Sequence, residues 1–413
     1  MTNNPQFQRP TFNFRGRKSP LALTIGILVI IGAAFTALSG FYADWLWFKS
    51  VNFTNTWSTI LLTKATLFVI TGLLTAGFVL LNVVLAYKRR PLYVPMSLEA
   101  DNLERYRGQI ENIRGRVVVL GSLALFYFAG TSGTTLWSTW LLFKNSTPFG
   151  VKDPQFNMDI SFFAFRLPFW QTLISWAIST IVLAILASTV VHYLYGGIRL
   201  QVREDRTTVA ARVQLSVLFG LVVLLKAVAY WFDRYALALK ESKLITGLTY
   251  TDVNAVLPAK AILAGIALVC ALLFFANIVR RSWVLPAAGT ALLVISSVLI
   301  AGLYPAAIQT FQVKPSESSK EAAFIQRNID ATRAAYGLQD VTVSDYQATL
   351  STSAGQLTKD AATIANIRLM DPNVISATFR QLQQIKPYYT FPDSLDIDRY
   401  TIDGVKRDVV VAV

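Results

Sequence analysis

The chain has 413 residues, of which 54% are apolar and 15% are charged, and its mean hydropathy is +0.46. This composition excludes an ordinary soluble globule and indicates that the lipid bilayer surrounds most of the chain. The formal charge of +14 does not indicate a nucleic-acid partner, because the excess of Lys and Arg flanks the apolar segments, where membrane orientation and anionic lipid explain it.

Apolar runs dominate the first three quarters of the chain. A helix needs about 20 apolar residues to cross the hydrocarbon core, and about seven runs reach that length. The sequence therefore predicts a basic cytoplasmic tail at 1–20 and an all-α membrane region of about seven transmembrane helices at 21–304. The predicted spans are 21–41, 60–85, 117–142, 169–194, 213–231, 261–278 and 284–303.

The distribution of basic residues predicts the orientation of these spans. The tail and every second connection carry 17 Lys and Arg, whereas the alternate connections carry 8. Short connections rich in Lys and Arg tend to stay in the cytoplasm. We therefore expect a plasma-membrane protein with a cytoplasmic N-terminus, and an odd number of spans places everything after residue 304 outside.

The segment 305–413 is more polar and predicts a soluble extracytoplasmic α/β domain. Ser318 and Glu321 have the spacing of a capping box, which predicts a helix beginning there. Asp371 and Pro372 form an N-cap and first-turn pair that predicts a second helix.

A β-hairpin is predicted near the C-terminus. Asp403 and Gly404 separate two β-prone runs at 397–402 and 405–411, as in a tight turn. The second run would form an apolar edge strand with nothing to cover it, so we expect this domain to continue beyond residue 413.

Several long segments resemble uncharacterised protein family 0182, bacterial multi-pass membrane proteins common in actinobacteria. They are FYADWLWF (41–48), RRPLYVP (89–95), DPQFNMDISFFAFRLPFW (153–170), YWFDRY (230–235), TYTDVNAVLPAKAIL (249–263), FQVKPSESSKEAAFIQRNIDATRAAYGL (311–338) and RQLQQIKPYYTFPDSLDIDRYTIDG (380–404). The resemblance spans nearly the whole chain. It implies seven membrane helices followed by a large extracytoplasmic domain, and no established activity or catalytic residue.

Lys226 is the most unusual residue of the predicted spans, because it interrupts an apolar run. A Lys at a helix centre costs about 2.5–3.5 kcal/mol on insertion scales. One hypothesis pairs Lys226 with Asp44 or with Asp233 in an ion or proton path. The other hypothesis has Lys226 snorkelling to the outer interface.

Other candidate groups have ordinary explanations. The single cysteine, Cys270, is expected to pack inside a span, and the single histidine, His192, lies at the end of one, which argues against a catalytic triad or a zinc site. Hydroxyl residues of the third span would line a polar cavity or serve helix packing: Thr131, Ser132, Thr134, Thr135, Ser138 and Thr139. Four acidic residues would bind calcium weakly or form a solvated face: Asp393, Asp396, Asp398 and Asp403.

No phosphate-binding, zinc-hydrolase, esterase or dinucleotide motif occurs in the chain, so we predict no cofactor and do not favour an enzyme. The leading hypothesis is an integral membrane protein that presents an extracytoplasmic domain for envelope assembly or binding. The alternatives are a transporter or lipid-handling protein that uses the bundle interior, and an envelope lipid or glycan enzyme. The expected partners are the bilayer and envelope proteins, lipids or glycans; the sequence does not indicate an oligomeric state.

Overall fold

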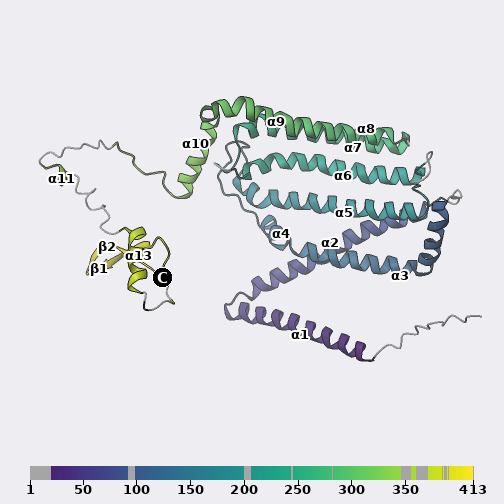
Figure 1. Ribbon diagram of the computed structural model, residues 1–413, viewed down its shortest axis with the longest axis horizontal. Coiled ribbons are helices and arrows are strands. Elements are labelled where there is room, and N and C mark those ends of the chain that lie inside the picture. The colour runs from purple at the N-terminus through teal and green to yellow at the C-terminus, as the bar shows by residue number, and fades with distance from the viewer. Residues whose placement is uncertain are drawn as a thin grey trace, which may run out of the picture. The chain divides into compact units, whose positions relative to one another are not determined.

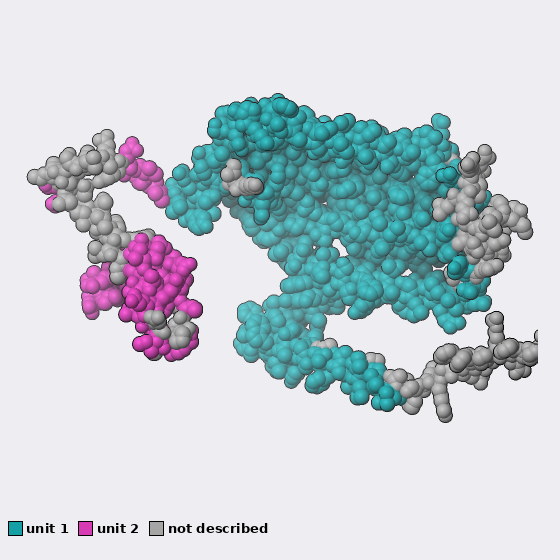
Figure 2. Space-filling view, in the orientation of Figure 1, with its two compact units in different colours: residues 1–339 teal, residues 340–413 magenta. Residues whose placement is uncertain are grey.

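The computed structural model describes residues 20–91, 98–199, 206–242, 245–280, 282–345, 355–359, 371–383, 385, 388 and 390–412 (Figure 1). The chain divides into two compact units, residues 1–339 and residues 340–413 (Figure 2). The first unit is helical. The second contains short helices and two strands.

Seven helices of the described residues are long and apolar enough to cross a membrane, which confirms the expected number of spans. Each predicted span overlaps one of them. The helices that carry the spans are α1 (Pro20–Ser50), α2 (Thr54–Lys88), α3 (Leu98–Thr134), α5 (Leu167–Leu194), α6 (Val209–Ala236), α7 (Leu257–Arg280) and α8 (Val284–Ser296).

The third predicted span was too long. It was expected to continue to residue 142, but α3 ends at Thr134 and a separate short helix, α4 (Trp137–Lys144), comes next. Gly130 and Gly133 weaken the last turns of α3, and the Thr134 and Thr135 hydroxyls donate to carbonyls three residues earlier. Local hydrogen bonding of this kind competes with the helical pattern and accounts for the break.

The helices α5, α6, α7 and α8 pack one beside the next, and α2 packs against α3 and α5 (Figure 1). Two apolar clusters form the core. One joins α2, α5 and α6 around Val79, Ala184 and Leu218. The other joins α6 and α7 around Ala227 and Cys270. Cys270 is buried as predicted, and its thiol donates to the Gly289 carbonyl of α8 at 3.1 Å.

Glycines bring α2 and α3 into close contact. A Cβ atom at Gly133 would lie 2.0 Å from the Thr71 hydroxyl oxygen, and one at Gly130 would lie 2.7 Å from the ring of Phe68. The Thr71 hydroxyl donates to the Ala129 carbonyl at 3.1 Å. Small residues that let helix backbones approach are a common means of association in membranes.

Within the described ranges, four π-helical segments interrupt the helices, and a proline follows each of them. The segments are Phe162–Arg166, Asp252–Val256, Ser297–Leu303 and Ile308–Val313, and the prolines are Pro168, Pro258, Pro305 and Pro315. In every case the carbonyl four residues before the proline belongs to the π segment. Proline cannot donate to that carbonyl and its ring collides with it, so the wider π turn relieves the clash.

The helix that carries the last predicted span continues beyond residue 303. Helical residues continue from 284 to 335 through α9 (Tyr304–Ala307), a short 3-10 turn (Lys314–Ser316) and α10 (Glu317–Ala335). The helix predicted from Ser318 and Glu321 is present as α10, which begins one residue earlier, at Glu317; the capping-box contact does not form, because Ser316 and not Ser318 precedes the helix. The Glu321 carboxylate instead accepts hydrogen bonds from the backbone of Tyr250.

The second unit confirms two local predictions. Helix α13 (Pro372–Leu382) begins at the Asp371 N-cap, whose carboxylate accepts from the Asn373 amide at 2.9 Å. Strands β1 (Asp396–Ile402) and β2 (Val405–Val411) form the antiparallel hairpin. Asp403 and Gly404 both have positive φ, 51° and 77°, as the tight turn requires. A further helical turn, α11, spans Gln356–Lys359.

Candidate functional site

The structure does not bring together the three residues predicted to form an intramembrane polar site, Lys226, Asp44 and Asp233. Lys226 is exposed on α6, and its ammonium group lies 5.5 Å from the centre of the Tyr230 ring, one turn further along. Asp233 is paired with Lys260 of α7 at 3.2 Å. Asp44 lies on α1, and in the described part of the chain no hydrogen bond or ion pair links it, or Asp233, to Lys226.

The hydroxyl groups at the end of α3 mostly bind their own helix. Thr131 donates to the Phe128 carbonyl at 2.9 Å, and Thr134 to the Thr131 carbonyl at 2.7 Å. Thr139, on α4, differs because it lines a cavity. The acidic residues of the second unit also lie apart: Asp393 pairs with Arg380, and no group of three or more metal-binding side chains occurs among the described residues.

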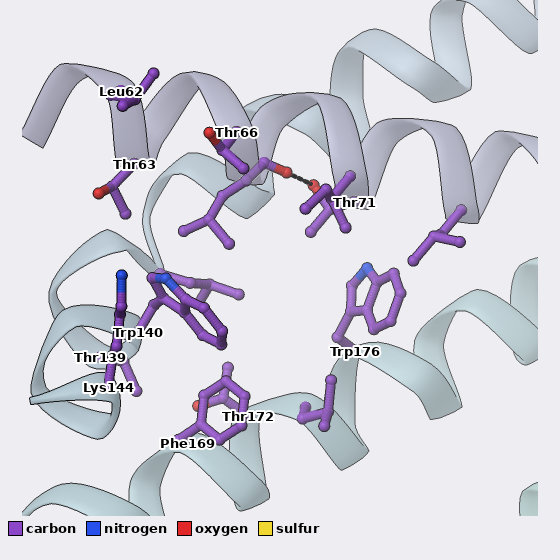
Figure 3. Close-up of a pocket in the computed structure, with 15 residues that line it drawn as sticks. Leu62, Thr63, Thr66, Thr71, Thr139, Trp140, Lys144, Phe169, Thr172 and Trp176 are labelled. Carbon is purple, nitrogen blue, oxygen red and sulfur yellow. Dashed lines mark hydrogen bonds between the residues drawn. The ribbon is translucent and has the colours of Figure 1, made fainter. Parts of the chain in front are cut away.

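The cavity has a volume of about 480 Å³ and lies between α2, α4 and α5. Figure 3 shows Trp140 and Phe169 on one side, Trp176 on another, and the Thr63 and Thr66 side chains along α2. Most of its wall is apolar or aromatic, and Lys144 supplies a cation at one end. Apolar walls with a few polar groups are typical of sites for small amphiphilic molecules.

Two loops at one end of the bundle are held by buried or half-buried carboxylates. We call this end the α10 end; it carries the loops 145–161 and 240–251 and helix α10. Asp252, which is 1% exposed, accepts from the Lys240 ammonium at 2.8 and 3.0 Å and from the Thr249 amide at 3.1 Å. The carboxylate lies where α7 begins, so the positive end of the helix dipole also favours its charge.

Asp159 holds the other loop in a similar way. Its carboxylate accepts from the amides of Phe149, Gly150 and Ser161 at 2.9 to 3.0 Å. These hydrogen bonds, with that of the Ser161 side chain as the largest cause, hold the pKa of Asp159 well below its ordinary value. The Asp159 carboxylate therefore fixes this loop immediately before the helix that carries the fourth predicted span.

Helix α10 is bound to both loops. Glu321, only 7% exposed, accepts from the Tyr250 amide with both carboxylate oxygens, at 2.9 and 3.1 Å. The Asn328 side chain donates to the Thr246 carbonyl at 2.6 Å, and Arg327 donates to the Gln155 side chain at 3.2 Å. We call this arrangement the α10 seat: the 145–161 and 240–251 loops, bound by α10.

A buried polar cluster lies at the opposite end of the bundle. His192 of α5 contacts Gln214 of α6 at 3.1 Å, and the Gln214 amide donates to the Asn82 carbonyl of α2 at 2.9 Å. Ser188 lies within 3.4 Å of the same amide. Interhelical hydrogen bonds of this kind stabilise helix association. Sequence reasoning missed this cluster, although polar Asn82 and Gln214 inside apolar runs were a visible signal.

Comparison with known proteins confirms the resemblance. The model of the Uncharacterised protein family (UPF0182) matches residues 21–413. A UPF0182 protein of Streptomyces coelicolor is 47% identical to the chain, over 96% of this chain and 40% of that protein. A UPF0182 protein of Frankia casuarinae is 46% identical, over 95% and 39%. The chain thus spans about two fifths of the length of these relatives, and no solved structure matches it.

Proposed function

The chain belongs to the uncharacterised protein family UPF0182, and we propose that it is a membrane anchor that presents an extracytoplasmic domain for envelope assembly or binding. Such an anchor requires that the residues following the last span be attached firmly to the membrane region. The helical residues from 284 to 335, which include π and 3-10 segments, and the binding of α10 to the loops provide this attachment within the first unit.

The observation that carries this proposal is the contact of Glu321 with Tyr250. A carboxylate that is almost fully buried is costly unless its hydrogen bonds are made, and the Tyr250 amide lies at the start of a helical segment, where amides lack intrahelical partners. Each group therefore satisfies the other. Because α10 is bound through this pair and through Asn328, the helix keeps a defined orientation on the loops.

The side of the membrane is inferred from charge. The connections opposite the α10 end carry most of the Lys and Arg of the membrane region, which favours a cytoplasmic location for them and an extracytoplasmic location for the α10 seat. Accessible single cysteines test this directly. In a Cys270→Ala background, a membrane-impermeant maleimide should label Ser319→Cys in intact cells and Asn112→Cys only after lysis. The reverse pattern would contradict the proposed orientation.

The presenting role has its own test. A deletion strain of a relative should regain detergent resistance when it receives the wild-type protein or a variant with Glu317→Gln, since Glu317 is exposed on the same helix. Glu321→Ala at equal abundance should restore resistance poorly, because α10 is released from its seat. Full restoration by Glu321→Ala would show that the seat is not needed for function.

The cavity of Figure 3 favours a second candidate, a protein that handles lipids or other amphiphiles in the bilayer. Its support is the combination of aromatic walls, hydroxyl groups and one Lys. Thr63→Trp, which fills the cavity, should then abolish rescue, while Thr59→Trp, one turn away on the exposed face of α2, should not. Equal rescue by both variants would contradict lipid handling through this cavity.

A further inference from the structure

A second cavity, larger than the first, opens at the end of the bundle opposite α10. It has a volume of about 600 Å³ and lies between α2, α3 and α5. Its walls are apolar side chains such as Val83, Val118 and Val190, and Gly115 and Gly121 contribute no side chain to the α3 wall. We call it the basic groove, because of the groups at its end.

Three arginines surround two tyrosines where the basic groove ends. The rings of Tyr87 and Tyr195 lie 5.1 Å apart, edge to face. The guanidinium groups of Arg90 and Arg114 lie 4.1 and 4.4 Å from the centre of the Tyr87 ring. The guanidinium of Arg107 lies 5.6 Å from the centre of the Tyr195 ring.

Among the described side chains at this end, positive groups outnumber the carboxylates that pair with them. Glu111 is the acidic partner, 3.9 Å from Arg90 and 3.7 Å from Arg114. The Arg107 guanidinium donates to the Leu194 carbonyl at 2.7 Å and has no carboxylate partner in the described part of the chain. Arg90 and Arg114 are exposed. In this described set, three guanidinium groups face one carboxylate, and N–H donors remain available to an anion.

We propose that the basic groove binds an anionic glycerophospholipid of the adjacent leaflet, with its head group at Arg90, Arg107 and Arg114 and an acyl chain along the apolar walls. Guanidinium groups bind phosphate oxygens with two parallel hydrogen bonds, and Arg is favoured wherever such recognition is needed. Basic pockets between membrane helices on the side of anionic lipid are typical head-group sites. This inference does not depend on the proposed anchoring function.

A lipid suits this groove better than a free phosphate ion does. The groove runs along α2 from Val79 to Tyr87, which is about 12 Å along the helix axis. A free phosphate would occupy only the arginine end and leave these walls empty. An acyl chain would cover them while its head group remained at the surface.

The test measures lipid retention by native mass spectrometry of the purified full chain, exchanged into detergent with equal amounts of phosphatidylglycerol and phosphatidylcholine. We expect phosphatidylglycerol to be retained in excess. Arg114→Gln should weaken its retention about fivefold, since each basic residue near an anionic surface contributes about 1 kcal/mol. Inorganic phosphate at millimolar concentration should not displace the lipid.

A steric variant tests the groove independently of charge. No atom lies within 4 Å of a Cβ built at Gly121, so Gly121→Leu should fold and extend into the groove, displacing the acyl chain. Gly77→Leu on α2 is the matched control, because its Cβ also meets no atom and it lines neither described cavity. Arg116→Gln is the charge control, two residues beyond Arg114 on the same helix.

The outcomes separate the proposal from its alternatives. Loss of phosphatidylglycerol in Arg114→Gln and Gly121→Leu, with wild-type retention in both controls, supports the groove. Equal retention of the two lipids by the wild type overturns the proposal. An equal loss in Arg116→Gln also overturns it, because general surface charge would then explain the preference, and displacement by inorganic phosphate would assign the arginines to a free anion.

Discussion

Replacing Glu321 with Ala should release the contact between α10 and the helical segment that begins at Tyr250. The wild-type carboxylate makes two hydrogen bonds to the Tyr250 amide, at 2.9 and 3.1 Å, and is 7% exposed. A hydrogen bond to a charged group contributes about 1.5–3 kcal/mol, and its loss leaves the amide without a protein partner. Because 1.36 kcal/mol corresponds to a factor of ten, local opening at Tyr250 should become about 10- to 150-fold more frequent.

Amide hydrogen exchange at Tyr250, in purified protein, measures this opening. Glu317→Gln should leave the exchange rate unchanged, because Glu317 is exposed on the same helix. Glu321→Gln should fall between the wild type and Glu321→Ala, since the side-chain amide retains one acceptor oxygen but carries no charge. If Tyr250 exchanges at the wild-type rate in Glu321→Ala, the contact does not stabilise the α10 seat and the reasoning is refuted.

Three other predictions test the buried carboxylates and the packing of the bundle. Lys240→Met should lower thermal stability in detergent more than Asp252→Asn does, because it leaves a carboxylate that is 1% exposed without its cation; since Lys240 is 46% exposed, the loss should stay below the value of about 3–5 kcal/mol for a fully buried pair, and the opposite order of the two variants would contradict the reasoning. The depressed pKa of Asp159 stabilises the 145–161 loop above the ordinary carboxyl pKa of about 3.9, and this stabilisation is lost as the pH falls below that value. Pepsin should therefore cut the loop increasingly fast below about pH 4 in the wild type, whereas Asp159→Asn should be cut readily at every acidic pH. Gly133→Ala should destabilise the protein by about 1–3 kcal/mol through overpacking against Thr71, and Thr71→Ala in the same chain should restore part of the loss in a thermal melt.

The spans were predictable because a helix that crosses lipid must be apolar over a length fixed by the bilayer. Their ends were less predictable, since hydropathy does not show at which residue a helix ends. The predicted third span ran across residues 135–136, because hydropathy does not show the break between α3 and α4, which depends on hydroxyl–carbonyl hydrogen bonds. In the second unit, Asp371 and the Asp403–Gly404 pair were readable because caps and tight turns require particular residues at particular positions.

The capping-box error has a physical cause. Ser318 and Glu321 have the right spacing for a helix start, but such a motif acts only if the preceding residues leave the helical conformation. Here Ser318 lies inside a helix that is already formed, since α10 begins at Glu317 and a 3-10 turn, Lys314–Ser316, precedes it. Glu321 was consequently free to satisfy a different helix start, at Tyr250, far away in the sequence.

The candidate sites were hard to predict for the same reason: they depend on pairs of residues from separate helices. Lys226 is conspicuous in the sequence because it is alone in an apolar run, yet in the structure it is exposed beside Tyr230. The groups that do meet are individually ordinary. In the sequence, Glu321 looks like a surface residue, and Arg90 and Arg114 look like parts of a basic connection. Only the packing of α10 on its loops, and of α2 against α3, brings these residues to their partners.

The two ends of the bundle are built differently, and this difference bears on function. At the α10 end, the carboxylates of Asp159, Asp252 and Glu321 are each satisfied by backbone amides of a loop or a helix start, so the end is rigid and its charges are used internally. At the opposite end, Arg90 and Arg114 remain exposed around an open groove. Carboxylates that are hydrogen-bonded within the protein suit the α10 end, where they hold a neighbouring segment. Arginines that outnumber their carboxylate partners suit the opposite end for binding an anionic surface. The proposed lipid site at one end and the bound α10 at the other would together suit the proposed anchor.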